Sequence, residues 1–443
     1  MQREGSLRAY SSFGTVLLLC VIAPVAYSAQ TVQVGSCISG LQSFSTIQLA
    51  IDTVGPNAIV DVCPGTYAEQ VQIPFTTLQL VGVLSGSGAT PVIVPPSGGL
   101  VANGKDIFGN PVAAQIIAFG SGRVTVSHLT VDGTGNNLAG CGGPTLEGIY
   151  FENVSGTITD NVVRNQYQTD FTDYGGCQNG LAINVESTGS SNSVTISNNS
   201  VRAYQKNGIT ATGAATGPGA LGPRVTIENN YIVGLAATGM NWQTPGAAEN
   251  GVQVGFGARG SVTNNVVNDN IWALDTSSQP GNAASGILIY ASTGISVTMN
   301  EVGSAQFGIV TNTDPTYGPG DNTTIKNNKV AGTQIFDGID LCSSSNTVET
   351  NTVYGSTQSG IHIDDSCGSG NNNTVTGNTV NEACAGILLG SGSGNTVAPN
   401  TLYNIENATL SGDVCPAAAG SSDLKGRRSQ RVIRPSPYVP SRR

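Results

Sequence analysis

Short runs of alternating aliphatic and polar residues dominate the chain, and turn-forming residues separate these runs. Gly286–Ile289 and Gly360–Ile363 are typical, because their side chains would point alternately to the two sides of an extended backbone. The chain has 59 glycines and only 10% charged residues, a composition that suits tight turns and β-branched strands rather than long helices. The pattern therefore predicts an all-β protein made of many short strands.

A six-residue pattern recurs nine times: an aliphatic residue, two variable residues, Asn, one variable residue and a second aliphatic residue. Consecutive asparagines lie 22 to 38 residues apart, and they are Asn161, Asn199, Asn230, Asn265, Asn300, Asn328, Asn351, Asn378 and Asn400. About 22 residues make one coil of a three-sided β-helix, so longer spacings indicate inserted loops. We expect the aliphatic residues to fill a common core. We also expect each Asn to take the left-handed backbone of a sharp bend and to stack its amide on the next coil.

The segments that precede the repeat suggest how such a solenoid begins. Phe44–Ile51 is typical of a short helix, Val60–Glu69 contains the sequence Pro-Gly-Thr-Tyr, and Leu78–Gly82 and Val124–Gly133 are typical of strands. With the repeat over about residues 120–405, these segments resemble the pectate-lyase-like superfamily of right-handed, single-stranded parallel β-helix proteins. The resemblance implies that fold, with the helix as an N-terminal cap. It does not select an activity, because the superfamily contains lyases, hydrolases, esterases, epimerases and adhesins.

The first 28 residues have the features of a signal peptide. Arg3 and Arg8 precede an apolar run at Val16–Val21 and a small-residue cleavage site at Ala26–Ser28, and the run is too short to span a membrane. We expect a secreted, periplasmic or cell-surface protein without a membrane span. The predicted parts are a signal peptide at 1–28, a cap with the first coils at 29–120, the repeats at 121–415 and a disordered basic tail at 416–443.

Eight cysteines follow the predicted signal peptide, an even number that suits disulfides in an exported protein. Eight cysteines allow 105 pairings, but neighbours in the sequence of a stacked solenoid are also neighbours in space. We therefore expect consecutive cysteines to pair, as Cys37–Cys63, Cys141–Cys177, Cys342–Cys367 and Cys384–Cys415.

Charge is distributed unevenly along the chain. Residues 30–422 include nine basic and 26 acidic residues, whereas Asp423–Arg443 includes seven basic ones. An acidic body disfavours nucleic acid and other polyanions as direct partners. We expect a monomer whose partner is a polysaccharide or other glycan, and Ca²⁺ is the cofactor to consider, because a cation can bridge an acidic protein to an acidic sugar.

A polar cluster is predicted in the C-terminal coils. Alignment on the repeat glycines Gly308, Gly338, Gly360 and Gly386 places four residues in one outward column, namely Val310, Asp340, His362 and Leu388. Neighbouring strands are about 4.8 Å apart, so acidic side chains on adjacent coils would lie close together. Two carboxyl groups can act as acid and base on a glycosidic bond, which makes the candidate catalytic residues Asp340, His362, Asp364 and Asp365.

The same acidic residues allow two other interpretations. Carboxylate oxygens are ligands that Ca²⁺ prefers, with Asp337, Asp340 and Asp364 as the candidate set. The aspartates could also serve only to cap turns beside a Cys342–Cys367 bridge. Asn312-Thr313-Asp314 and Asp364-Asp365 resemble motifs of polygalacturonase-type glycosidases, but one more coil separates them here and the Gly-His-Gly and Arg-Ile-Lys motifs of that family are absent.

Long loops are predicted at 166–178, 211–223, 240–249, 273–284 and 313–320. Insertions in a solenoid tend to emerge on one side, so we expect them to wall a groove in which aromatic side chains stack on sugar rings. The candidate substrate-binding residues are Arg164, Arg202, Tyr167, Tyr204 and Trp242. The two arginines could bind an acidic sugar in a β-eliminating lyase, or they could simply be exposed residues at strand edges.

Two functions remain open from the sequence. The first is a carbohydrate-active enzyme, hydrolase or lyase, that works in the loop-walled groove. The second is a non-catalytic surface or envelope protein whose β-helix binds glycans or acts as a spacer. An intact acid and base pair would favour the first function.

Overall fold

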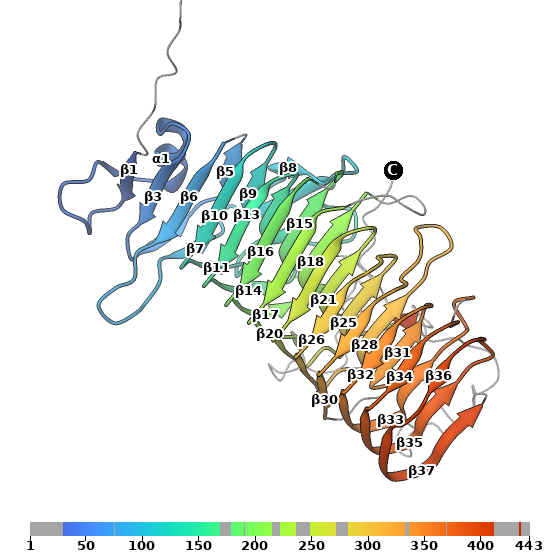
Figure 1. Ribbon diagram of the computed structural model, residues 1–443. Helices are drawn as coiled ribbons and strands as arrows, with labels where there is room; N and C mark the ends of the chain where they lie inside the picture. Colours follow the sequence, from blue (N-terminus) through green and yellow to red (C-terminus); the bar gives the residue numbers. More distant parts are fainter. Residues whose placement is uncertain are drawn as a thin grey trace, which may run out of the picture.

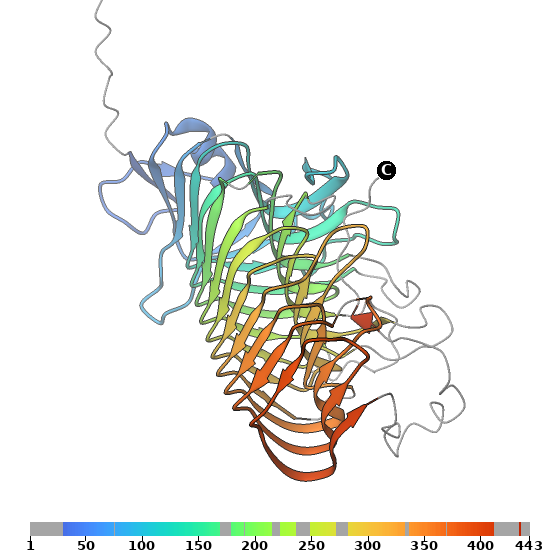
Figure 2. The same ribbon diagram turned by 45° about the vertical axis from the view of Figure 1, so that its right-hand side comes forward.

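The computed structural model describes residues 30–411, except 75, 169–178, 190, 215–221, 236–248, 272–281, 333–335 and 369, and also residues 434–435. The chain winds into a stack of coils, which follow one another along one axis from the N-terminal to the C-terminal end (Figure 1). Strands pair in parallel with their equivalents in the coils before and after, and successive coils lie side by side along the stack (Figure 2). This architecture is the parallel β-helix that the sequence predicts.

The first face of the solenoid is a sheet of 14 strands with one strand from each coil. In spatial order its strands are β2 (Ser43–Phe44), β1 (Thr31–Val34), β3 (Ala58–Val62), β6 (Leu78–Gly82), β10 (Arg123–Ser127), β13 (Ser155–Thr159), β16 (Ser193–Ser197), β19 (Arg224–Glu228), β22 (Arg259–Thr263), β26 (Ser296–Thr298), β29 (Thr324–Lys326), β32 (Thr347–Glu349), β34 (Thr374–Thr376) and β36 (Thr396–Val397).

The second face lies immediately after the asparagine positions. Its strands are β4 (Thr66–Ala68), β7 (Val92–Val94), β11 (Thr130–Asp132), β14 (Val162–Gln166), β17 (Ser200–Tyr204), β20 (Tyr231–Val233), β23 (Val266–Asn268), β27 (Glu301–Gly303) and β30 (Lys329–Ala331). Three long strands continue from the second face into the third without a break, and they are β33 (Thr352–Ile363), β35 (Thr379–Leu389) and β37 (Thr401–Ser411).

The third face carries the candidate site. Its strands are β5 (Val71–Pro74), β9 (Pro111–Phe119), β12 (Thr145–Glu152), β15 (Leu181–Ser187), β18 (Asn207–Gly213), β21 (Asn250–Gly255), β25 (Ser285–Tyr290), β28 (Phe307–Asn312) and β31 (Ile339–Cys342). A short strand, β8 (Gly104–Lys105), lies antiparallel to β9, and β24 (Asn282–Ala283) pairs with β38 (Arg434–Pro435) from the basic tail.

The predicted N-terminal helix is present as α1 (Ile47–Thr53), which lies at the N-terminal end of the stack (Figure 1). The Thr46 side chain accepts a hydrogen bond from Leu49 N–H, and the Glu69 carboxylate accepts hydrogen bonds from Ile47 and Gln48 N–H at 3.0 and 3.1 Å. These contacts satisfy backbone donors that a first helical turn leaves free. No helix within the described residues is long and apolar enough to cross a membrane.

The asparagine ladder is confirmed from Asn161 to Asn400. The amide of Asn265 donates to Asn300 Oδ1 at 3.0 Å and to the Ile227 carbonyl at 2.9 Å, and the other coils repeat this arrangement. The predicted backbone conformation of these asparagines is wrong. The left-handed residue is the one before each of them, as in Asn264 with φ of 56° and Met299 with φ of 57°, except at Asn400, which follows Pro399. That bend turns the next side chain inward, where its amide replaces the backbone partners that a corner loses.

The core lies inside the three faces, as the aliphatic positions of the repeat predict. Ile158, Val163 and their equivalents are fully buried in one continuous cluster that runs from Val32 to Ile387. The disulfides Cys37–Cys63 and Cys342–Cys367 are confirmed. Cys141 and Cys384 are also disulfide-bonded, and their predicted partners, Cys177 and Cys415, lie outside the described residues, as do residues 1–28.

Candidate functional site

The outer surface of the third face is polar and yet buried. One outward column contains the residues two positions after each repeat glycine, or after Ala182 where alanine replaces that glycine, and adjacent strands hold these residues in register. From the N-terminal end they are Tyr150, Asn184, Thr210, Gln253, Leu288, Val310, Asp340 and His362, and all except the partly exposed His362 are buried. The predicted alignment of Val310, Asp340, His362 and Leu388 is therefore confirmed.

Two clusters of acidic residues lie at the two ends of this outer surface. The C-terminal cluster is defined by Asp337, Asp340 and His362, and the N-terminal cluster by Glu147 and Glu186. Apolar residues of β25 and β28 separate them, since Leu288, Phe307 and Val310 pack with Phe336 in a second hydrophobic cluster outside the solenoid core.

In the C-terminal cluster an imidazole lies between two carboxyl groups. His362 Nδ1 is 3.2 Å from Asp337 Oδ2 and 4.0 Å from Asp340 Oδ1. The position of Asp337 is fixed by Ser359, whose N–H donates to Asp337 Oδ1 at 3.0 Å and whose hydroxyl donates to the same oxygen. Asp340 Oδ1 is buried and has no hydrogen-bond partner. The cluster therefore contains one anchored carboxyl group and one that is available.

The environment separates the protonation states of these groups. Burial, and then the charge of Asp364, raise the pKa of the Asp340 carboxyl well above its usual range. Burial alone would lower the pKa of His362, but the charge and hydrogen bond of Asp337 and the charges of Asp340 and Asp364 raise it to about 10. The surroundings therefore favour the cationic form of His362, and they hold the proton on Asp340 to a higher pH than an exposed aspartate would.

Asp364 and Asp365 follow the cluster and point to different partners. Asp364 Oδ1 accepts from Ser366 N–H at 2.7 Å and Asp364 Oδ2 from the Ser366 hydroxyl at 2.7 Å, beside the Cys342–Cys367 disulfide. Asp365 accepts from the N–H and hydroxyl of Ser391 on the following coil. The charges of His362 and Asp364 both act on Asp340, whereas the hydrogen bonds of Asp365 go to Ser391.

The predicted Ca²⁺ ligands do not form the set that was expected. The ligand atoms of Asp337, Asp340 and His362 lie within 4.8 Å of one another, so the imidazole takes the place expected for Asp364. A protonated imidazole has no free electron pair for a metal, and Ca²⁺ prefers oxygen ligands. A second group, Cys342, Asp364 and Cys367, contains two disulfide sulfurs rather than thiolates. The C-terminal cluster is better suited to proton transfer than to holding Ca²⁺.

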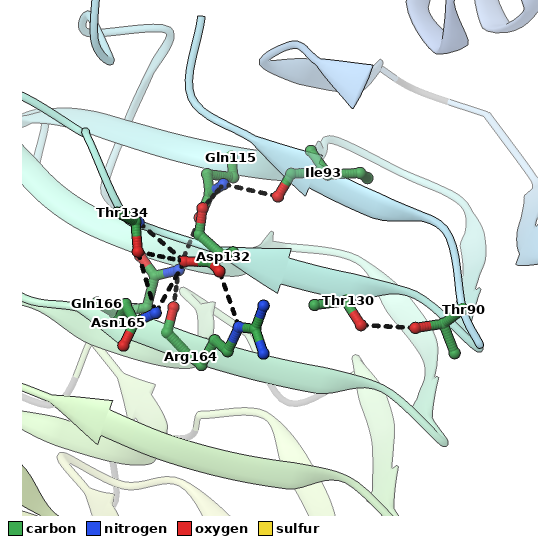
Figure 3. Close-up of polar contacts among 9 residues, drawn as sticks. All are labelled: Thr90, Ile93, Gln115, Thr130, Asp132, Thr134, Arg164, Asn165 and Gln166. Carbon is green, nitrogen blue, oxygen red and sulfur yellow. Dashed lines mark hydrogen bonds and ion pairs between the residues drawn. The ribbon is translucent and has the colours of Figure 1, made fainter. Parts of the chain in front are cut away.

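The predicted substrate-binding residues occupy different environments. Arg164 and Arg202 are partners on adjacent strands, as expected. Arg164 Nε donates to Asp132 Oδ2 at 2.8 Å, and Asp132 also accepts from Asn165 and Thr134 (Figure 3). Burial opposes these contacts, yet together they hold the pKa of the Asp132 carboxyl below its usual value. An arginine engaged in this way is a poor base, which argues against the lyase interpretation.

The aromatic candidates do not form one sugar-binding surface. Tyr204 is fully buried in the solenoid core and donates its hydroxyl hydrogen to Asn270 Oδ1 at 2.5 Å, so its ring cannot stack on a sugar. Tyr167 is half-buried. Trp242 lies outside the described residues, as does most of the predicted loops at 166–178, 211–223, 240–249 and 273–284. The expectation for Tyr204 is therefore wrong, because the left-handed Ala203 interrupts the alternation of β17 and Tyr204 turns inward.

Sequence reasoning missed the N-terminal cluster. Glu147 precedes the repeat glycine Gly148 just as Asp337 precedes Gly338. Glu186 lies in the outward column that continues to Cys342, two residues beyond Asn184. The alignment on repeat glycines was applied only from Gly308 onward, so a signal that was present in the sequence was not used for these coils.

Comparison with known proteins agrees with the fold. A family model described as right handed beta helix region matches residues 183–402. The Dettilon tailspike protein is similar, with a TM-score of 0.53 and 16% identity over 80% of this chain. The alignment covers 63% of the tailspike protein, so this chain spans less than two thirds of its length. No curated protein matches the sequence. The family match covers just under half of the chain, and with the similar tailspike structure it shows the right-handed parallel β-helix fold.

Two solved structures of enzymes are also similar in part. A lacto-N-biosidase from Eubacterium ramulus has a TM-score of 0.47 and 11% identity, over 87% of this chain and 68% of the enzyme. An exopolygalacturonase from Yersinia enterocolitica has a TM-score of 0.43 and 12% identity, over 85% of this chain and 78% of the enzyme.

Proposed function

We propose that this chain is an exported, glycan-directed β-helix protein and that the C-terminal cluster hydrolyses a glycosidic bond. The observation that carries the proposal is the buried Asp340 carboxyl, whose raised pKa lets it keep a proton to higher pH and whose Oδ1 lies 4.0 Å from His362 Nδ1. Glycoside hydrolysis needs one carboxylic acid that can give a proton and one carboxylate that acts on the opposite side of the bond.

In the proposed reaction Asp340 gives its proton to the glycosidic oxygen as the bond from that oxygen to the anomeric carbon breaks. Asp364, held as an acceptor by the two donors of Ser366, takes a proton from the water that attacks the anomeric carbon. His362 positions the cluster and limits the repulsion between carboxyl groups, because its imidazolium lies next to Asp337 and Asp340. Proton exchange with solvent then returns Asp340 to its acid form.

Access to this cluster is expected from the side of His362 and Asp364. Asp337 and Asp340 are buried, whereas His362 and Asp364 are partly exposed. A glycan would therefore contact His362 and Asp364 before it reaches the proton of Asp340. This arrangement favours binding at one bond of the substrate. It also keeps bulk water away from the Asp340 carboxyl, which strengthens the electrostatic interactions of that group.

Export is supported by chemistry rather than by the predicted signal peptide, which lies outside the described residues. Cys37–Cys63 and Cys342–Cys367 are disulfides, and such bonds persist in oxidising compartments outside the cytosol. A glycan outside the cell is then the natural substrate for a loop-bordered outer surface.

The experiment is an activity screen of the purified mature protein on pectate, alginate and neutral polysaccharides, with Ca²⁺ and with a chelator. New reducing ends and ultraviolet absorbance of unsaturated products are followed together. We expect reducing ends without unsaturation, and a loss of about 100-fold or more in Asp340→Asn and in Asp364→Asn. Asp160→Asn is the matched control, because that aspartate is exposed and bonds only its neighbour Thr159 among described residues.

Either of two results would overturn the proposed reaction. The first is a wild-type rate in Asp340→Asn with an intact circular dichroism spectrum. The second is unsaturated product, which would assign a lyase and return attention to Arg202.

The second candidate function, a non-catalytic glycan-binding or spacer protein, is favoured by one specific observation. Asp337 and Asp364 both accept hydrogen bonds from a backbone N–H and a serine hydroxyl, which is how structural turns are fixed. Glycan binding without any product from wild-type protein would support this function.

A further inference from the structure

At the N-terminal end of the same outer surface, two glutamates are held by one amide. Asn184 Nδ2 donates to Glu147 Oε1 at 3.0 Å and to Glu186 Oε1 at 3.1 Å. Glu147 is on β12 and Glu186 on the neighbouring strand β15, and all three side chains are fully buried. One amide nitrogen therefore lies between the two carboxyl groups and contacts both of them.

A loop and a tyrosine close this cluster from outside. Glu186 Oε2 accepts from the Tyr150 hydroxyl at 2.9 Å and from Ile107 N–H at 3.2 Å. Asp106, the residue before Ile107, adds a further acidic side chain that is only 4% exposed. The cluster therefore has a defined wall of donors on one side of Glu186 and an excess of negative charge within it.

No basic side chain compensates this charge. Among the described residues, ion pairs form at Arg164, Lys326, Lys329 and His362, and none of them reaches Glu147 or Glu186. Burial and the charge of Glu186 raise the pKa of Glu147 well above its usual range, and burial and Asp106 raise the pKa of Glu186 to about 7. Without a cation, folding must therefore keep protons on these carboxyl groups.

The independent sign of a ligand is a set of buried oxygen atoms without partners. Glu147 Oε2 and Asn184 Oδ1 are both buried and have no hydrogen-bond partner. Thr212 Oγ1 is also buried without a hydrogen-bond partner, and Thr212 is in register with Glu186 on the adjacent strand. Buried polar atoms in native proteins are nearly always satisfied, so three unsatisfied oxygens around two carboxyl groups indicate that something is bound here.

We propose that Glu147, Glu186 and Asn184 bind a divalent cation, with Ca²⁺ as the fitting ion. Carboxylate and amide oxygens are hard ligands, and a half-turn of the Asn184 amide would bring Oδ1 between the two carboxylates in place of Nδ2. Ca²⁺ accepts a nearly complete shell of protein oxygens, whereas Mg²⁺ retains several waters, for which this fully buried position offers little room. This proposal is independent of the reaction proposed for the C-terminal cluster.

The test is calorimetric titration of CaCl₂ into chelator-treated mature protein at neutral pH, followed by thermal unfolding with and without Ca²⁺. We expect one bound Ca²⁺, a higher midpoint of unfolding in its presence, and at least a tenfold weaker affinity in Glu147→Gln and in Glu186→Gln. Asp337→Asn and Asp340→Asn are the matched controls, because they change the C-terminal acidic cluster, and they should bind Ca²⁺ as wild type does.

Three outcomes would overturn the site. They are no Ca²⁺ binding by wild-type protein, unchanged affinity in both glutamine variants, or loss of binding only in the Asp337 and Asp340 variants. Because glutamine is close in shape to glutamate, the variants should fold, and circular dichroism in chelator verifies this. Competition with MgCl₂ supplies a second readout: a preference for Mg²⁺ would contradict the assignment of Ca²⁺.

Discussion

The two ends of the third face both bury a pair of carboxyl groups, but they compensate the negative charge in different ways. Asn184 and His362 lie in one outward column, and each is next to a pair of buried carboxyl groups. At the C-terminal end the imidazole brings its own positive charge, whereas at the N-terminal end a neutral amide leaves the charge uncompensated. One residue in a repeated position thus decides whether a cluster carries an internal cation or needs an external one.

The largest expected effect comes from removing the internal cation. His362→Ala should destabilise the protein by about 3–5 kcal/mol, because it leaves the buried Asp337 and Asp340 carboxyl groups without their positively charged neighbour. Urea unfolding at neutral pH measures the change. The same substitution made in an Asp337→Asn/Asp340→Asn protein should cost clearly less. Equal costs in both backgrounds would mean that His362 acts through packing and not through charge.

Removing a carboxyl group should change the stability of the protein in opposite directions at the two ends of the third face. In chelator above pH 7, Glu147→Gln should stabilise the protein by about 1–2 kcal/mol, since the cost of burying this carboxyl group without a cation is removed. Asp337→Asn should destabilise it by about 1–3 kcal/mol, since the partner of His362 is lost. Thermal unfolding of both variants under one condition gives the comparison. Destabilisation by Glu147→Gln with added Ca²⁺ but not in chelator would sharpen the contrast further.

The two clusters should lose their contributions to stability in two different pH ranges. The pKa of Glu186 is raised from 4.5 to about 7, so its contribution is complete below pH 4.5 and is lost as pH rises through about 7. The pKa of His362 is raised from 6.5 to about 10, so its contribution is complete below pH 6.5 and is lost as pH rises through about 10.

Unfolding in chelator across these pH values tests the assignment. Glu186→Gln should remove only the change in unfolding free energy near pH 7. His362→Gln should remove only the change near pH 10. A change near pH 7 that persists in Glu186→Gln would place the titrating group elsewhere.

The smallest effect is expected at the exposed ion pair on the second face. Arg164→Ala should change stability by less than about 1 kcal/mol, because the arginine side chain is 37% exposed and exposed pairs contribute little. The same variant should keep hydrolytic activity. A loss of activity similar to that of Asp340→Asn would reinstate a substrate-binding or lyase role for Arg164.

The sequence predicts the fold well because its strongest signal, an inward Asn with aliphatic neighbours, is also the strongest structural constraint. The register of Asp340 and His362 follows from the repeat glycines alone. The left-handed position was misplaced by one residue, since sequence shows that a bend is present but not which peptide turns. The inward side of Tyr204 was missed because alternation is broken at the end of a strand, where Ala203 has φ of 56°.

What sequence could not show is which charges are buried. The outward column was expected to face solvent, and the structure shows it covered, which converts ordinary carboxyl groups into proton-holding ones. Burial of an outward side chain depends on the loops of other coils, and no local pattern encodes that. Glu147 was within reach of the alignment on glycines, but its significance depends on the amide of Asn184 on the next strand.

The in-register stack also fixes the distance between the two clusters. Five coil steps separate Asn184 from Asp340, so the two clusters are about 24 Å apart and the continuous asparagine ladder leaves little freedom to change that length. Duplication or deletion of one whole coil would shift the separation by about 4.8 Å while preserving every contact within the remaining coils. Gain or loss of a coil during evolution would thus change the distance between the two clusters in fixed steps, and the residues of each cluster would stay the same.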